Sequence, residues 1–330
     1  MGHRRRFLAV LLAVSLADFL VGGGVRSSLA GFTEQETTAA TFTTAACFVD
    51  TVAPSVGSTV GAKTVQYLPG YIRQGGTYFV FANVSDAGGG CTPSGVATVR
   101  TNVSSITTGQ TTVTVAPGSF SVGGAAYGYR TASMTANTTL AAGTYSYSIT
   151  STDAATNSRL ETGYTVIVDN TRPAGADIQT ANGGSTVGKP EIGDTVTYAF
   201  TEPIDPQSVL AGWTGAATSV VARIIQGTGG DQLSIRNASN TAALPLGTAN
   251  LVGTGYVTAN RDFGATGTPS TMTQSGTSIS ITFGTASGAT GTQASAGTVS
   301  WPPPTTLTDR AGNACQTAAT LESGVADVEF

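Results

Sequence analysis

Apolar and polar residues alternate with a period of two in many short stretches of the chain. The alternation runs through residues 144–149, 195–200 and 278–283, and residues 164–168 are apolar on both faces. Because successive side chains of a strand point to opposite faces, this pattern predicts half-buried β-strands. Turn signals rich in Gly, such as residues 88–90, separate the stretches. The sequence therefore predicts an all-β protein, and the only helix signal is a single turn in which Pro206 follows the capping residue Asp205.

Two short motifs occur twice, and in the same order each time. Asp-x-x-x-Pro stands at 50–54 and 169–173, and Asp-x-Ala-x-Asn stands at 153–157 and 309–313. A proline opens an edge strand without needing a donor, and Asp and Asn side chains bond the backbone of tight turns. Each repeat thus opens with one motif and closes with the other.

This duplication predicts two tandem domains. The expected boundaries are 48–168 for the first domain and 169–330 for the second, which carries a Gly/Thr-rich insert around 262–298. Many short strands with turn signals between them are typical of β-sandwiches.

The first 30 residues have the pattern of a secretory signal peptide. Three arginines at 4–6 precede an apolar run over 7–20, and small residues lead to Ala30, so cleavage is expected between Ala30 and Gly31. A retained membrane anchor is the alternative, which the shortness of the run and its Asp18 disfavour. The prediction is an extracellular or cell-surface protein without membrane association after cleavage, with residues 31–47 as a leader.

Composition argues against most enzyme classes. The only histidine is His3, inside the predicted signal peptide, so neither a Ser-His-Asp triad nor a His-ligated metal site is expected. No nucleotide-binding glycine motif precedes a helix. The formal net charge of −4 gives no electrostatic reason to expect nucleic acid. The sequence predicts a protein that is not an enzyme and requires no cofactor.

Three cysteines leave the redox state open. Export permits a disulfide between Cys47 and Cys91, which leaves Cys315 unpaired. The alternative is three reduced, buried thiols.

Calcium is the one ion that the acidic turn residues suggest. Asp153, Asn157, Asp169 and Asn170 lie around the expected domain boundary, and calcium binds carboxylate and amide oxygens. Ordinary turn capping explains the same residue types without a metal.

The motifs resemble bacterial immunoglobulin-like repeats of large surface proteins. The likeness rests on Asp50–Pro54, Ser151–Asn157, Gly193–Pro206 and Thr308–Asn313, and it covers most of residues 48–330. It implies two tandem immunoglobulin-like sandwiches in an adhesin-like, matrix or cell-surface protein. The implied partner is a surface ligand, protein or polysaccharide, that the motifs do not specify.

Two further functions stay open. The junction at 29–44 resembles exported proteins of bacilli that a specialised signal peptidase processes, among them biofilm-fibre proteins, and this implies self-association through a strand donated by residues 31–47. A flexible leader is the alternative there. Trp213 and Trp301, if exposed, would suit a carbohydrate-binding module, whereas core packing is the other expectation for both.

Overall fold

The computed structural model describes residues 49–64 and 66–330. Strands dominate these residues, and the helix among them is the four-residue α2 (Pro206–Val209). The prediction of an all-β protein with two sandwich-like units is therefore confirmed. The predicted signal peptide, its junction at Ala30 and Gly31, and the leader all lie outside the described residues.

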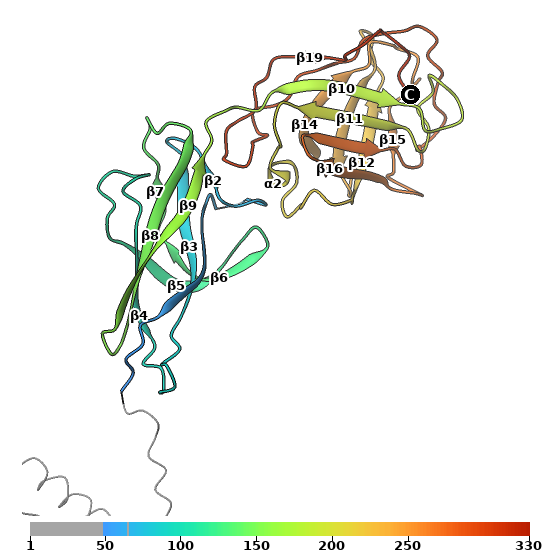
Figure 1. Cartoon of the computed structure of the whole chain (residues 1–330). Helices are drawn as coiled ribbons and strands as arrows, with labels where there is room; N and C mark the ends of the chain where they lie inside the picture. Colours follow the sequence, from blue (N-terminus) through green and yellow to red (C-terminus); the bar gives the residue numbers. More distant parts are fainter. Residues whose placement is uncertain (1–48, 65) are drawn as a thin grey trace, which may run out of the picture. The chain divides into compact units, whose positions relative to one another are not determined.

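The described strands form two sheets, and each curls into two facing layers (Figure 1). The first contains β1 (Ser55–Ala62), β2 (Tyr71–Ile72), β3 (Thr77–Ser85), β4 (Val96–Asn102), β5 (Val113–Val122), β6 (Ala125–Thr131), β7 (Met134–Thr135), β8 (Gly143–Asp153) and β9 (Ser158–Val168). The second contains β10 (Gly175–Ala181), β11 (Thr195–Phe200), β12 (Thr218–Ile225), β13 (Gln232–Asn237), β14 (Ala243–Asn250), β15 (Arg261–Phe263), β16 (Ser270–Ser275), β17 (Ser278–Thr282), β18 (Ser300–Trp301) and β19 (Thr320–Leu321).

The first sandwich has the strand order β1-β3-β6-β5-β4-β8-β9-β2, with β7 paired to β3. Strand β5 joins the layers, because its first residues pair with β4 and the rest pair with β6. Between the layers lie buried side chains such as Val80 of β3, Val99 of β4 and Ile149 of β8. Each such side chain contributes about 1.5–3 kcal/mol by leaving water. The predicted alternation therefore buries one face of each layer.

Strand β3 is buried on both of its faces. Phe79 and Phe81 point away from the main core into a second small cluster, which Phe120 and Tyr127 of the β5–β6 hairpin cover. The guanidinium of Arg130 lies over the rings of Phe79 and Phe120, 4.6 and 4.4 Å from their centroids. These cation–π contacts hold the arginine against an apolar surface.

The second sandwich has the strand order β10-β11-β17-β16-β12-β13-β14-β18-β19, with β15 paired to β12. Along β11, Val196, Tyr198 and Phe200 are buried and the residues between them are half-buried, as the alternation predicts. The predicted insert region 262–298 contributes β16 and β17 to this sheet. Although this region is rich in Gly and Thr, part of it therefore forms strands of the second sandwich.

Both tryptophans belong to the core of the second sandwich. Trp301 is fully buried, packs edge-on against Tyr198 and Phe200 at centroid distances of 4.9 and 5.1 Å, and donates from Nε1 to the Leu246 carbonyl at 2.6 Å. Trp213 is also buried and donates to the Ala216 carbonyl at 2.6 Å. Core packing therefore holds for both, and neither ring is exposed to stack on a sugar.

The predicted helical turn forms where expected. The Asp205 carboxylate accepts a hydrogen bond from the Gln207 amide at 3.2 Å, and Pro206 is the first helical residue. Proline fits there because the first amides of a helix have no intrahelical acceptor. Among the described residues, no helix has the length and apolar character needed to cross a membrane.

We predict that Trp301→Ala destabilises the second sandwich by about 3–5 kcal/mol, because it removes the largest buried ring and leaves a cavity. Urea unfolding followed by tyrosine fluorescence measures this loss. Val325→Ala is the control, since Val325 is 88% exposed. Equal stability of the two variants would contradict the placement of Trp301 at the centre of the core.

Candidate functional site

Each sandwich closes with the same hydrogen-bonded turn. In the first, the carboxylate of Asp153 accepts the backbone amide and the side-chain amide of Asn157, both at 2.7 Å. The Asn157 side chain also donates to the Asp50 carbonyl at 3.0 Å. The turn after β8 is therefore tied to the segment that opens the same sandwich.

The second sandwich repeats this arrangement atom for atom. Asp309 accepts the backbone and side-chain amides of Asn313 at 2.7 and 2.8 Å, and Asn313 donates to the Asp169 carbonyl at 2.8 Å. Asp153 and Asp309 are each only 2% exposed. The two duplicated motifs thus meet in space within each repeat, a closing aspartate beside an opening one.

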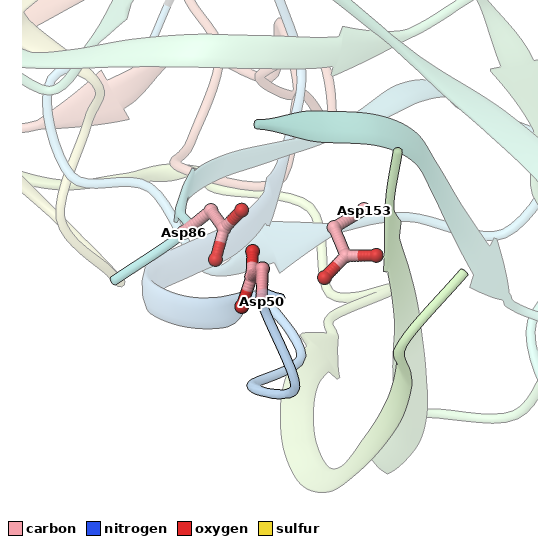
Figure 2. A group of neighbouring side chains, drawn as sticks. All are labelled: Asp50, Asp86 and Asp153. Atoms are coloured by element: carbon pink, nitrogen blue, oxygen red, sulfur yellow. The ribbon is translucent and has the colours of Figure 1, made fainter. Parts of the chain in front are cut away.

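A third carboxylate completes a cluster in each sandwich. Asp86 follows the end of β3 and joins Asp50 and Asp153, and Figure 2 shows the three carboxylates facing one another. Glu202 follows the end of β11 and joins Asp169 and Asp309. In each cluster, one oxygen from every residue lies within 4.8 Å of the others.

Backbone amides compensate the charge of the first cluster. Asp50 accepts the amides of Ser94 at 2.8 Å and Val52 at 3.0 Å, and these two bonds lower its pKa. Asp86 accepts the Gly95 amide at 2.8 Å. Hydrogen bonds to the ionised form favour that form, so the carboxylate of Asp50 stays charged.

Hydrogen bonds compensate less of the negative charge in the second cluster than in the first. The Oε1 atom of Glu202 is buried without a hydrogen-bond partner. Burial, followed by the neighbouring charges of Asp309 and Asp169, raises the pKa of Glu202 to about 7. Burial also raises the pKa of Asp309. At neutral pH this cluster therefore favours a bound proton or cation.

The four calcium candidates do not gather at one place. Asp153 and Asn157 belong to the first cluster and its turn, and Asp169 belongs to the second cluster. Asn170 takes part in neither, because its side chain accepts the Gln74 amide and donates to the Leu140 carbonyl, both at 2.8 Å.

Of the six acids in these two clusters, four were not among the calcium candidates: Asp50, Asp86, Glu202 and Asp309. Two of them, Asp50 and Asp309, belong to the duplicated motifs, which marked the start and the close of each repeat but not their meeting in space. Asp86 and Glu202 both follow the end of a strand, but they share no motif. Only the fold brings them to the other two acids.

The cysteines fall into two environments. Cys91 is disulfide-bonded, and its predicted partner Cys47 lies outside the described residues, so the pairing stays a prediction. Cys315 is a free thiol in the second core, and burial raises its pKa to about 11. A thiol with so high a pKa is a poor nucleophile.

Fold and site together define an all-β protein of two sandwich-like units, each closed by an Asp–Asn turn beside a carboxylate cluster. No protein-family model matches the chain, and no curated protein matches it either.

We predict that Asn313→Ala and Asn157→Ala each lower the free energy of unfolding by about 1–3 kcal/mol. Each substitution keeps the backbone amide on Oδ1 of the aspartate but removes the side-chain donor to its buried Oδ2 and to the carbonyl of the opening segment. Chemical denaturation measures the loss, with Gln110→Ala at an exposed amide as the control. A loss no larger than that of the control would contradict the role of the turn.

Glu202 should give the protein a pH-dependent stability. Its pKa rises from 4.5 to about 7 on folding, so between these values the folded state holds more protons and stability falls as pH rises. We predict that Glu202→Gln raises the Tm above that of the unsubstituted chain, and that this increase is several degrees larger at pH 8 than at pH 5. Calorimetry in the presence of EDTA measures the Tm of both proteins at each pH.

Glu191→Gln is the matched control for this titration. Hydrogen bonds from Lys189 and Ser185 lower the pKa of Glu191 to about 2, so both its folded and unfolded pKa values lie below pH 5. Its effect on Tm should be equal at pH 5 and pH 8. If Glu202→Gln also changed the Tm by the same amount at pH 5 and pH 8, the raised pKa of Glu202 would be disproved.

Proposed function

We propose that the chain is a non-enzymatic, exported surface or extracellular structural protein, in which the two sandwiches act as immunoglobulin-like repeat modules. The observation that carries this proposal is the duplicated closing turn, with its Asp–Asn pair and its bond to the opening segment in both sandwiches. Many cell-surface domains share the β-sandwich architecture. The signal-peptide pattern of residues 1–30 supports export.

An adhesive role agrees with the reactive side chains that the two modules contain. After His3 the sequence has no histidine to serve as a general base, and the one described free thiol is buried. The loops and sheet faces of the sandwiches are the surfaces that would contact a protein or polysaccharide ligand.

No cofactor is required in this proposal, and calcium, the one ion that the acidic turn residues suggest, would stabilise the second carboxylate cluster most. Asp169, Glu202 and Asp309 offer hard oxygen ligands, and one buried oxygen of Glu202 has no other partner. A bound cation would supply the countercharge that backbone amides supply at Asp50 and Asp86. A ligand that binds only the folded state stabilises it.

A fibre subunit is the second candidate function. The residues around the predicted cleavage junction at Ala30 and Gly31 favour it, because they resemble those of exported biofilm-fibre proteins. In this proposal the leader 31–47 is donated as a strand to a neighbouring copy, whose sheet edge offers unpaired backbone groups.

Electron microscopy and sizing of 31–330 beside a 48–330 truncation distinguish the two functions. For a repeat module we expect monodisperse monomers from both forms, with and without calcium. Filaments from 31–330 that disappear in the truncation would overturn the adhesion module in favour of the fibre subunit.

A further inference from the structure

A third carboxylate cluster lies in the second sandwich, outside the duplicated turns. Glu322, Asp327 and Glu329 each place one carboxylate oxygen within 4.8 Å of the other two. They come from the segment after β19, the last described strand (Figure 1). No repeated motif contains them, so the function proposed above does not account for this cluster.

Backbone hydrogen bonds fix the positions of all three residues. Glu322 donates its amide to the Val299 carbonyl at 2.9 Å, and the Asp327 carbonyl accepts the Gly297 amide at 2.7 Å. The Glu329 amide donates to the Tyr256 hydroxyl at 3.0 Å. The backbone at all three acids is therefore attached to the rest of the sandwich.

Phe330 anchors the end of this segment. Its ring is 1% exposed and packs against Tyr256 and Phe283, at centroid distances of 5.7 and 5.1 Å. The Gly188 amide donates to its carbonyl at 2.6 Å. Apolar burial thus holds the carboxylates together despite their mutual repulsion.

Glu329 carries an oxygen that nothing in the fold satisfies. Its side chain is fully buried, Oε2 accepts the Thr180 hydroxyl at 2.5 Å, and Oε1 has no hydrogen-bond partner. In the part of the chain that the structure describes, no Lys or Arg forms an ion pair with any of the three acids. Native proteins leave few buried polar atoms unsatisfied, and each one needs an explanation.

The charges around the cluster are all of one sign. Glu322, Asp327 and Glu329 repel one another, and the carboxylate of Asp177 adds to the negative charge that acts on Glu322. The other titratable group against the cluster is the Tyr256 hydroxyl. A cation would relieve this repulsion and take up the free oxygen.

We propose that Glu322, Asp327 and Glu329 bind a calcium ion that fastens the segment 321–330 to the second sandwich. Each of the three carboxylates places one oxygen in the cluster, and calcium accepts six to eight oxygen ligands in flexible geometry, so water would supply the remaining ligands. Asp327 is exposed, so water can complete the coordination from the solvent side. Magnesium fits less well, because it demands a near-ideal octahedron and keeps most of its own water.

Calcium titration of the full chain tests the site, with Asp327→Asn as the main variant. Because Asp327 is exposed, this change removes one ligand charge without opening the core. Loss of a residue that only supports a metal ligand already costs about 10–100-fold in affinity, so we expect a loss of at least about tenfold at one site. Glu161→Gln, in the first sandwich and outside all three carboxylate clusters, is the matched control and should leave this site unchanged.

Two local readouts separate this site from calcium bound elsewhere. Calcium should slow amide hydrogen exchange of residues 321–330 in the unsubstituted chain and in Glu161→Gln, but not in Asp327→Asn. Bound Tb³⁺ should give luminescence on tyrosine excitation, because Tyr256 adjoins the cluster, and this signal should fall in Asp327→Asn and Glu329→Gln. If Glu329→Gln does not fold, Asp327→Asn alone decides.

Unchanged calcium affinity and stoichiometry in Asp327→Asn, with no calcium effect on exchange in 321–330, would overturn the site. The cluster would then hold a proton shared between Glu322 and Glu329. The outcome is independent of the surface role, since it is read in one segment of the second sandwich and not from adhesion or assembly.

Discussion

The architecture depends on a buried aspartate that closes the last turn of each sandwich. Asp153 and Asp309 are almost inaccessible to solvent, and burying a carboxylate is costly unless hydrogen bonds replace water. Asn157 and Asn313 supply these bonds with a backbone amide and a side-chain amide each. The same asparagine reaches the opening segment, so one interaction sets both the turn and the place where the chain enters the sandwich.

This requirement explains which parts of the molecule could be predicted from the sequence. Alternation in 144–149 and 195–200 predicts β8 and β11 because each buries one face, and the repeated Asp and Asn residues predict turns because their side chains act locally. Burial of both faces of β3 could not be predicted. It depends on the β5–β6 hairpin, whose Phe120 and Tyr127 cover Phe79 and Phe81 from more than thirty residues away.

The candidate sites illustrate the same division between local and distant effects. Asp153 and Asp169 lie close together in sequence and were expected to share one ion, yet each lies in the cluster of its own repeat. The pairing that matters joins Asp50 to Asp153 and Asp169 to Asp309, over more than a hundred residues. The order of the strands in each sheet decides which aspartates meet, and the spacing of residues along the sequence does not predict it.

The three clusters differ in how the fold compensates negative charge. Amides of Ser94 and Gly95 satisfy the first cluster, because the loop between β3 and β4 turns its backbone toward Asp50 and Asp86. No such loop serves Glu202 or Glu329, and each keeps one buried oxygen without a partner. A chain with only 10% charged residues has few cations to pair with such acids. Arg310 offsets only part of the charge around Glu202, so a proton or a metal ion from solution supplies the further countercharge. The stability of the second sandwich therefore depends on its medium more closely than that of the first.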